Sequence, residues 1–345
     1  MRFICYSDWN QLPESANALF VRGAKESIFF SRAWFECLTT TALDNDQTMV
    51  LACVVSGNKV MAILPLLESA GSKAWYALRH GFTPRYGLLL AEDDQERVLS
   101  CLAEALSQLT VNALLLEPVA ENDSTLSRLQ ELLVTNGFSC DRIFRNYNWI
   151  YRLQGKSYED YMAGRPARLR NTIARKTRKL EREHGYEIRL FSGDEVPRRM
   201  RDYYVVYNAS WKQNEIKNVG FQDCFVEDFS QAGWSRLAVL YIKGQPVAAQ
   251  LWFVHHDKAS IFRLAYDEAW KQYSTGSILT SFLMEYVIDI DRVEEIDFLT
   301  GNDAYKQDWM SERSECFLLC FLRNKSTESG YHRVVGVLKH MLKIR

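Results

Sequence analysis

Short apolar runs on either side of a glycine turn predict β-hairpins at two places in the chain. Residues 49–67 contain two apolar runs around Ser-Gly-Asn, and residues 237–254 contain two around Lys-Gly-Gln. Runs of this kind, bounded by turn residues, are typical of paired strands. When Gly57 is placed on Gly244, the apolar residues after each turn also align. The two hairpins therefore resemble each other.

The same order of elements follows each hairpin. The pattern predicts a strand at 74–78 and 259–265, a helix at 96–109 and 277–289, and a further strand at 111–117 and 294–300. Chance similarity between two hairpins is the alternative. The shared order instead favours an internal duplication of one α/β unit.

A helix that stops at Asn136-Gly137, followed by two strands, closes the first half. We therefore expect domains at 1–155 and 156–325, followed by an amphipathic helix at 326–345. Basic residues lie between the apolar positions of that tail. It is expected to dock on its own domain, and peripheral contact with a membrane surface is the alternative.

Composition agrees with an ordinary two-domain globular chain. The 345 residues correspond to two domains of about 150 residues each. The 42 basic and 43 acidic side chains nearly cancel, which argues against DNA as a partner. No uncharged apolar run is long enough to span a bilayer, and no signal peptide is evident. We therefore expect the protein in the cytoplasm.

The eight cysteines are scattered among apolar neighbours, and none forms a Cys-x-x-Cys pair. Such residues usually behave as buried thiols. The six histidines are scattered too, so the sequence predicts no metal site.

The second half carries a recognisable series of residues. The most direct are Tyr273, Gly276, Leu279, Asp297, Phe298, Gly301, Tyr305 and Lys306. The Ser-Trp-Lys triplet 210–212 and the basic segment 168–182 precede them. With these residues the chain resembles the CelD-like acetyltransferase family, a branch of the GNAT-fold N-acyltransferases that has tandem GNAT domains, as in the FemAB aminoacyl transferases.

The resemblance implies an α/β fold of two tandem GNAT-like domains, each a mixed, mainly antiparallel sheet flanked by helices. It implies an enzyme that moves an acyl group from acetyl-CoA, another acyl-CoA or another thioester to an amine. We expect the amine on an amino sugar or on a lipid-linked envelope or polysaccharide precursor. The first domain lacks an equivalent phosphate turn, so we expect it on the acceptor side.

The donor's phosphates are expected at a turn that opens a helix. Free backbone N–H groups and the helix dipole favour anions at such a position. Gly276 would let the backbone approach closely. A simple N-cap is the alternative reading of this turn. The residues assigned to the donor are Gln272, Ser274, Thr275, Gly276 and Ser277.

Proton transfer requires a carboxylate or phenol with a suitable pKa. The candidates are Asp297, Asp303, Tyr266 and Tyr305. Asp297 lies within an apolar strand, so it needs a partner such as Lys306, Arg263 or a backbone amide. The resemblance assigns Tyr305 as the acid that protonates the leaving thiolate.

Substrate-binding roles are assigned to Trp211, Lys212, Arg175 and Lys306. Most of the basic segment is expected to be a solvated helix face. It would also suit transfer RNA, so FemAB-like aminoacyl transfer is one alternative function. A non-catalytic assembly protein of polysaccharide synthesis is the other.

Overall fold

The computed structural model describes residues 1–212 and 219–323, which form two compact units. Unit 1 contains Met1–Asn146 and the segment that starts at Ser314, and unit 2 contains Tyr147–Arg313. Strands β7 (Phe138–Arg152) and β13 (Glu312–Arg323) both contain a junction between the units. The chain therefore passes between the units within these two strands.

This division differs from the expected domains 1–155 and 156–325. Residues 314–323 belong to unit 1 because β13 pairs with β6 (Ala113–Ala120), for example at Phe321↔Leu114. The expected helix at 326–345 lies outside the described residues.

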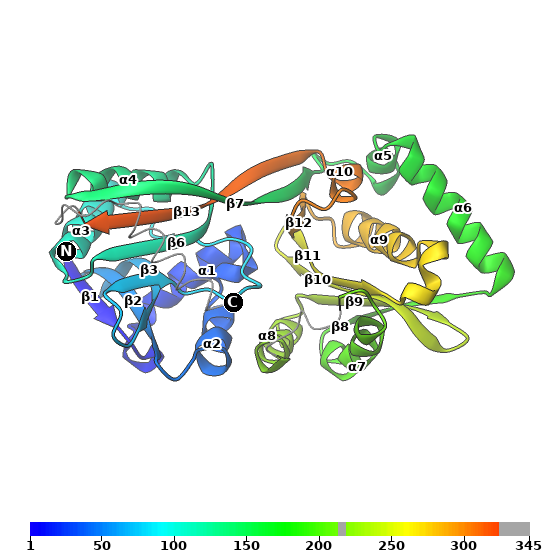
Figure 1. Cartoon of the computed structure of the whole chain (residues 1–345), viewed down its shortest axis with the longest axis horizontal. Coiled ribbons are helices and arrows are strands. Elements are labelled where there is room, and N and C mark those ends of the chain that lie inside the picture. The colour runs from blue at the N-terminus through cyan, green and yellow to red at the C-terminus, as the bar shows by residue number, and fades with distance from the viewer. Residues whose placement is uncertain (213–218, 324–345) are drawn as a thin grey trace. The chain divides into compact units, whose positions relative to one another are not determined.

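In unit 1 the strands run in the order β1-β2-β3-β4-β6-β13, and β5 pairs with β3 (Figure 1). Their pairing is antiparallel except between β4 and β6. Helix α3 packs on α4, and α1 packs beside β3. The elements not yet introduced are β1 (Arg2–Tyr6), α1 (Asn17–Glu26), α2 (Arg32–Thr41), β2 (Gln47–Ser56), β3 (Lys59–Ser69), β4 (Ala74–Ala77), β5 (Leu89–Leu90), α3 (Gln95–Gln108) and α4 (Ser124–Thr135).

In unit 2 the strands run in the order β7-β12-β11-β10-β9-β8. Their pairing is antiparallel except between β11 and β12. The elements are α5 (Tyr158–Ala163), α6 (Ala167–Glu183), β8 (Glu187–Ser192), α7 (Glu195–Asn208), α8 (Val219–Gln231), β9 (Ser235–Ile242), β10 (Gln245–His255), β11 (Lys258–Tyr266), the 3-10 helix η4 (Glu268–Tyr273), α9 (Thr275–Glu285), β12 (Glu295–Thr300) and α10 (Lys306–Trp309).

The two units repeat the same order of elements, which confirms the expected duplication. The hairpin β2–β3 corresponds to β9–β10, β4 to β11, α3 to α9, and β6 to β12. In each unit the strand after the hairpin pairs in parallel with the strand that follows the helix. Each unit is therefore a mixed, mainly antiparallel sheet with helices, as the sequence predicts.

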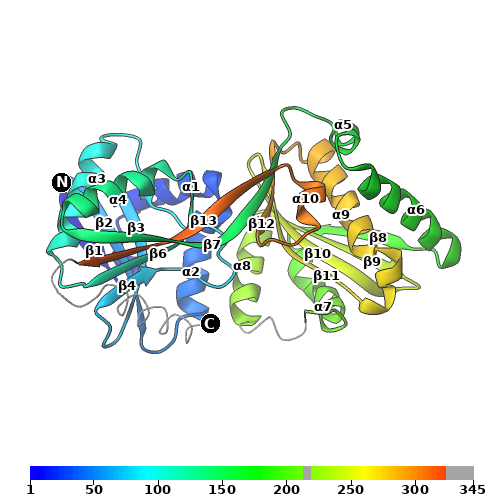
Figure 2. The same cartoon turned by 45° about the horizontal axis from the view of Figure 1, so that its top comes forward.

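Strand β10 places side chains on two faces of the unit 2 sheet because side chains alternate along a strand. Figures 1 and 2 show α9 on one face and α7 on the other. Gln250 and Trp252 lie on the α9 face, where Gln250 binds the first turn of that helix. Phe253 lies on the other face and packs against Phe225 of α8. Unit 2 is thus packed on both faces.

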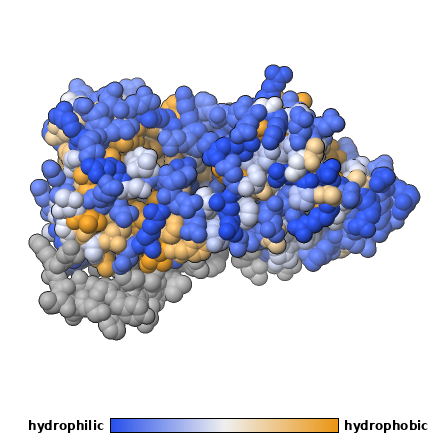
Figure 3. Space-filling model, turned by 90° about the horizontal axis from the view of Figure 1, so that it is seen from above, coloured by the Kyte–Doolittle hydropathy of each residue, from blue (hydrophilic) through white to orange (hydrophobic). Residues whose placement is uncertain are grey.

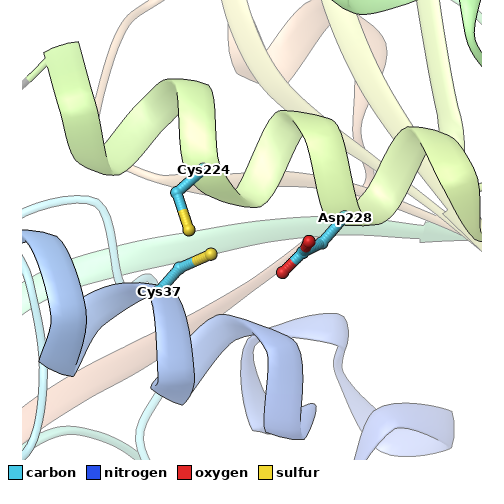
Figure 4. A group of neighbouring side chains, drawn as sticks. All are labelled: Cys37, Cys224 and Asp228. Carbon is cyan, nitrogen blue, oxygen red and sulfur yellow. The ribbon is translucent and has the colours of Figure 1, made fainter.

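Six cysteines are free thiols in the described residues, and Cys53, Cys316 and Cys320 are buried as expected. Cys5 is exposed instead. Figure 4 shows Cys224 projecting from α8 of unit 2, on the same helix as Asp228, and Cys37 projecting from α2 of unit 1. In the part of the chain that is described, no helix combines the length and apolar character needed to cross a membrane.

We predict that Gln250→Leu lowers the free energy of unfolding by about 2–4 kcal/mol, because it leaves a buried indole N–H without an acceptor. Gln250 is 1% exposed, accepts from Trp252 Nε1 at 2.9 Å and donates to the Gly276 carbonyl at 3.0 Å. Denaturant unfolding measures the loss. The double variant with Trp252→Phe should recover part of it, since the orphaned donor is gone. Equal loss in the single and double variants would contradict this account.

Candidate active site

Strands β11 and β12 separate at their C-terminal ends. They pair only between Lys258–Ser260 and Glu295–Asp297, although β11 continues to Tyr266. β12 also shifts its register against β7 after Asp297. After Ser260, the backbone groups of β11 that face β12 do not pair with that strand. Such an edge can bind the amide groups of an extended ligand.

Lys306 on α10 holds the bent end of β12. Its ammonium donates to the carbonyl oxygens of Phe298 at 2.8 Å, Leu299 at 3.2 Å and Thr300 at 2.7 Å. The bend needs these donors because Leu299 has a φ of 54°, which turns consecutive carbonyls toward one point. Gly301 follows with a φ of 125°, a conformation that strongly favours glycine.

We expected Lys306 to bind substrate, and the structure gives it a different role. The side chain is 4% exposed, and the three backbone carbonyls occupy its three N–H groups. Burial lowers the pKa of Lys306 to about 8, so the amine remains mainly protonated at neutral pH. It therefore positions the strand end and is not available as a ligand for substrate.

Asp297 is half-buried on β12, and its partners are two hydrogen-bond donors, of which one is a backbone amide as the sequence allowed. The side-chain amide of Asn148 on β7 donates at 3.0 Å, and the backbone N–H of Leu299 donates at 2.7 Å. Both bonds go to Oδ1, so within the described residues Oδ2 has no hydrogen bond. Burial raises the pKa of Asp297 to about 6, and the two donors oppose that shift. A carboxylate of this kind can accept a proton near neutral pH.

The turn that opens α9 has features of an anion site. The N-cap Ser274, with a φ of 55°, provides no side-chain cap for the first N–H groups of α9, although the N–H of Ser277 donates to the Ser274 carbonyl at 2.9 Å. Thr275 is fully buried, and its hydroxyl has no hydrogen-bond partner among the described residues. Ser277 lies in the first turn and is half-buried. These groups could receive phosphate oxygens.

The structure explains the glycine at position 276 by a contact that the sequence does not reveal. A Cβ at this position would lie 3.1 Å from Cδ1 of Tyr266, so the glycine lets the end of β11 pack against α9. The close approach predicted for a phosphate is thus an approach of the Tyr266 ring. Trp211 in turn contacts Tyr266, with ring centroids 4.5 Å apart, and is 49% exposed.

The basic helix α6 borders this turn. Lys176 donates from Nζ to the carbonyl of Gln272, and Lys179 lies 4.9 Å from the centre of the Tyr273 ring. The Tyr273 hydroxyl donates to Glu183 at 2.9 Å and lies 2.8 Å from Nε2 of His184. These contacts fix the C-terminal half of α6 next to the start of α9. Figure 3 shows that the surface around α6 is largely hydrophilic.

The remaining candidates lie around α10. Tyr305 is 40% exposed, and the pKa of its hydroxyl is raised because desolvation and the Asp303 carboxylate disfavour the phenolate. The hydroxyl of Tyr305 therefore stays protonated at neutral pH and is available as a hydrogen-bond and proton donor. Asp303 accepts the backbone N–H of Lys306 with its carbonyl. The charge of Lys212 contributes to the lowered pKa of Lys306, so that side chain is also near.

The structure brings most of the predicted residues to one edge of unit 2. Arg175 is the exception, because it is exposed on α6 and has no hydrogen bond or ion pair within the described residues. Asn148 and Gln250 were not predicted from the sequence, whereas Lys176 lies in the basic segment 168–182 that was. Asn148 stands between two aromatic residues in a strand, which is a weak signal of a functional polar residue, and Gln250 gave no such signal.

Residues 167–307 match the model of the acetyltransferase (GNAT) domain. Among solved structures, FemX matches 93% of this chain and 98% of its own, with a TM-score of 0.64 and 10% identity. The lysylphosphatidylglycerol synthetase named L-PGS from Bacillus licheniformis matches over 90% and 96%, with a TM-score of 0.57 and 12% identity. A tandem GNAT protein of the clavulanic acid pathway matches over 95% and 99%, with a TM-score of 0.50 and 12% identity.

Among curated proteins none matches the chain. The family model and the structural matches confirm the expected fold, a GNAT-type acyltransferase domain within a tandem arrangement.

We predict that Asp297→Asn raises the free energy of unfolding by about 1–3 kcal/mol at pH 7.5. The folded-state pKa is above the usual 3.8, so the carboxylate charge costs stability above pH 6. The amide oxygen can still accept both hydrogen bonds now made to Oδ1. Near pH 4.5 the folded state is already protonated, and the gain should fall to about a third.

Denaturant unfolding at the two pH values measures this effect. Glu295→Gln is the control on the same strand, because Glu295 pairs with Arg152 and Lys258 and its neutralisation should not stabilise the fold. A pH-independent difference for Asp297→Asn would show that its charge is not destabilising.

Proposed function

We propose that the chain transfers an acyl group from acyl-CoA to an amine, because residues 167–307 match the model of the acetyltransferase (GNAT) domain. One observation supports the proposal: unit 2 contains a helix start of the kind that suits anions, a strand edge that opens next to it, and a carboxyl with a pKa of about 6 on the other strand of that opening. Each corresponds to a requirement of acyl transfer from a phosphorylated thioester.

The donor's phosphates bind at the first turn of α9, close to Lys176, and its amide groups lie along the unpaired end of β11. The acceptor amine gives a proton to Oδ2 of Asp297, and its nitrogen attacks the thioester carbonyl. The carbon–sulfur bond then breaks, and Tyr305 protonates the leaving thiolate. The products are an amide and a free thiol, and the proton on Asp297 returns through solvent to Tyr305.

The acceptor is best sought among small amines that contain a ring. Trp211 presents an exposed indole beside Tyr266, and exposed aromatic faces bind flat or apolar ring surfaces. An amino sugar in an envelope or polysaccharide precursor meets that requirement. The amine would approach from the side of Lys212.

A second candidate is aminoacyl transfer from charged transfer RNA, with the amine attacking an ester instead of a thioester. Arg175 and Arg178 are exposed on the flank of α6 that also carries Lys179, beside the proposed donor turn. A basic stripe at this place suits an RNA backbone. The fold likeness to FemX agrees with this candidate.

We predict that Ser277→Asp weakens acetyl-CoA binding at least about tenfold, because a carboxylate in the first turn of α9 repels phosphate. The same carboxylate interacts favourably with the helix dipole, so the thermal stability of the protein should not fall. Calorimetric titration with acetyl-CoA and a long-chain acyl-CoA provides the measurement. Ser277→Asn is the uncharged control and should bind within a few fold of wild type. Unchanged binding by the aspartate variant would place the donor elsewhere, and no binding by wild type would remove acyl-CoA.

For the second candidate, we expect Arg175→Glu to weaken binding of charged transfer RNA several fold and to reduce its salt dependence by about one charge. Arg170→Glu is the matched control, since Arg170 is exposed on the opposite flank of the same helix. Filter binding at several salt concentrations measures both. Equal effects of the two substitutions would indicate nonspecific attraction and would count against transfer RNA as donor.

A further inference from the structure

A buried carboxylate in unit 1 is bound by two arginines at once. Glu117 on β6 has a side chain that is 5% exposed. Nη2 of Arg79 donates to its Oε1, and Nε of Arg145 donates to its Oε2. Two guanidinium groups and one carboxylate leave this cluster with a charge of +1. One arginine alone would have neutralised Glu117.

The cluster lies at the C-terminal edge of a parallel strand pair. β4 and β6 are in register up to Tyr76↔Leu115, so Arg79 and Glu117 come just after the last paired residues. Arg145 comes from β7. In unit 2 the corresponding parallel pair is β11–β12, and its C-terminal edge carries Asp297 and Tyr266. The arginine cluster therefore occupies the place in the repeat that corresponds to the candidate active site.

Both arginines keep donors that Glu117 does not use. A guanidinium has five N–H groups in a planar fork that fits the oxygens of phosphate or carboxylate. Each arginine uses one nitrogen on Glu117, and among the described residues no other hydrogen bond of Arg79 or Arg145 is seen. Their side chains are 30% and 24% exposed. The remaining donors are thus held in place by a buried anion and reach solvent.

We propose that Arg79 and Arg145 bind a phosphate group, at a site in unit 1 that is separate from the donor turn of unit 2. Glu117 orients both guanidinium groups before the ligand arrives. Phosphate is favoured over carboxylate because its three or more oxygens can accept from two forks together. The inference does not depend on the proposed acyl transfer, since it concerns binding in the other unit. The phosphate could belong to a soluble ester or to a lipid headgroup.

The test is protection of individual arginines from an arginine-specific dicarbonyl reagent, followed by peptide mass spectrometry of the full chain. Millimolar inorganic phosphate should slow modification of Arg79 and Arg145 by about threefold or more, while Arg128 is unaffected. Arg128 is a suitable internal control because it is an exposed arginine of unit 1 that pairs with Glu96 and Glu131. This readout reports on unit 1 even if phosphate also binds at α9.

Two variants sharpen the result. Glu117→Gln leaves only one acceptor oxygen for the two arginines, so their orientation is lost and protection should require a several-fold higher phosphate concentration. Arg79→Lys keeps the charge but removes one planar guanidinium group. It should therefore reduce the protection of Arg145 severalfold. If the glutamine variant does not fold, the lysine variant still decides the question.

Equal protection of Arg128, or equal protection by acetate at matched ionic strength, would overturn a phosphate site. Absence of any protection would also overturn the phosphate site. It would mean that the two arginines only neutralise Glu117. Glycerol 3-phosphate and vesicles of phosphatidic acid in phosphatidylcholine distinguish the two sources. Protection by the ester alone assigns a soluble ligand, and protection by vesicles alone assigns a lipid.

Discussion

The separation of β12 from β11 depends on one buried ammonium group. Three consecutive carbonyls at the end of β12 point to Lys306, an arrangement that a regular strand cannot make because successive carbonyls point in opposite directions. The left-handed conformation of Leu299 and the positive φ of Gly301 are the backbone cost of that arrangement. The bend also brings the Leu299 N–H to the Asp297 carboxylate. The open strand edge and the orientation of the carboxyl thus share one origin.

The duplicated units use the same frame for different electrostatics. In unit 2 the strand that follows the helix carries Asp297, which accepts from neutral donors and whose pKa is raised by burial. In unit 1 it carries Glu117, which is ion-paired with Arg79 and Arg145. The first arrangement suits a group that gains and loses a proton, and the second holds two guanidinium groups on one carboxylate. The duplication places Asp297 and Glu117 at corresponding positions of the two units. Side chains on neighbouring segments give the two carboxyl groups different partners.

Local patterns predicted much of the fold, because hairpins depend on adjacent apolar runs and a glycine turn such as the one at Gly244. The repeat followed from the order of those patterns. The return of residues 314–323 to unit 1 could not be predicted, since it depends on pairing with a strand about 200 residues away. A backbone amide was among the expected partners of Asp297, and the Leu299 N–H confirms it. Asn148 could not be predicted, because it lies on another strand.

The two junctions inside β7 and β13 affect the order in which the protein can be completed during synthesis. Unit 2 is inserted between Asn146 and Ser314 of unit 1. At the usual rates of translation, the strand that pairs with β6 leaves the ribosome roughly ten to thirty seconds after the rest of that sheet. During that interval β6 has an unpaired edge, the kind of surface that recruits other strands. The N-terminal unit is therefore finished last, and its nascent sheet is the part of the chain most in need of a chaperone.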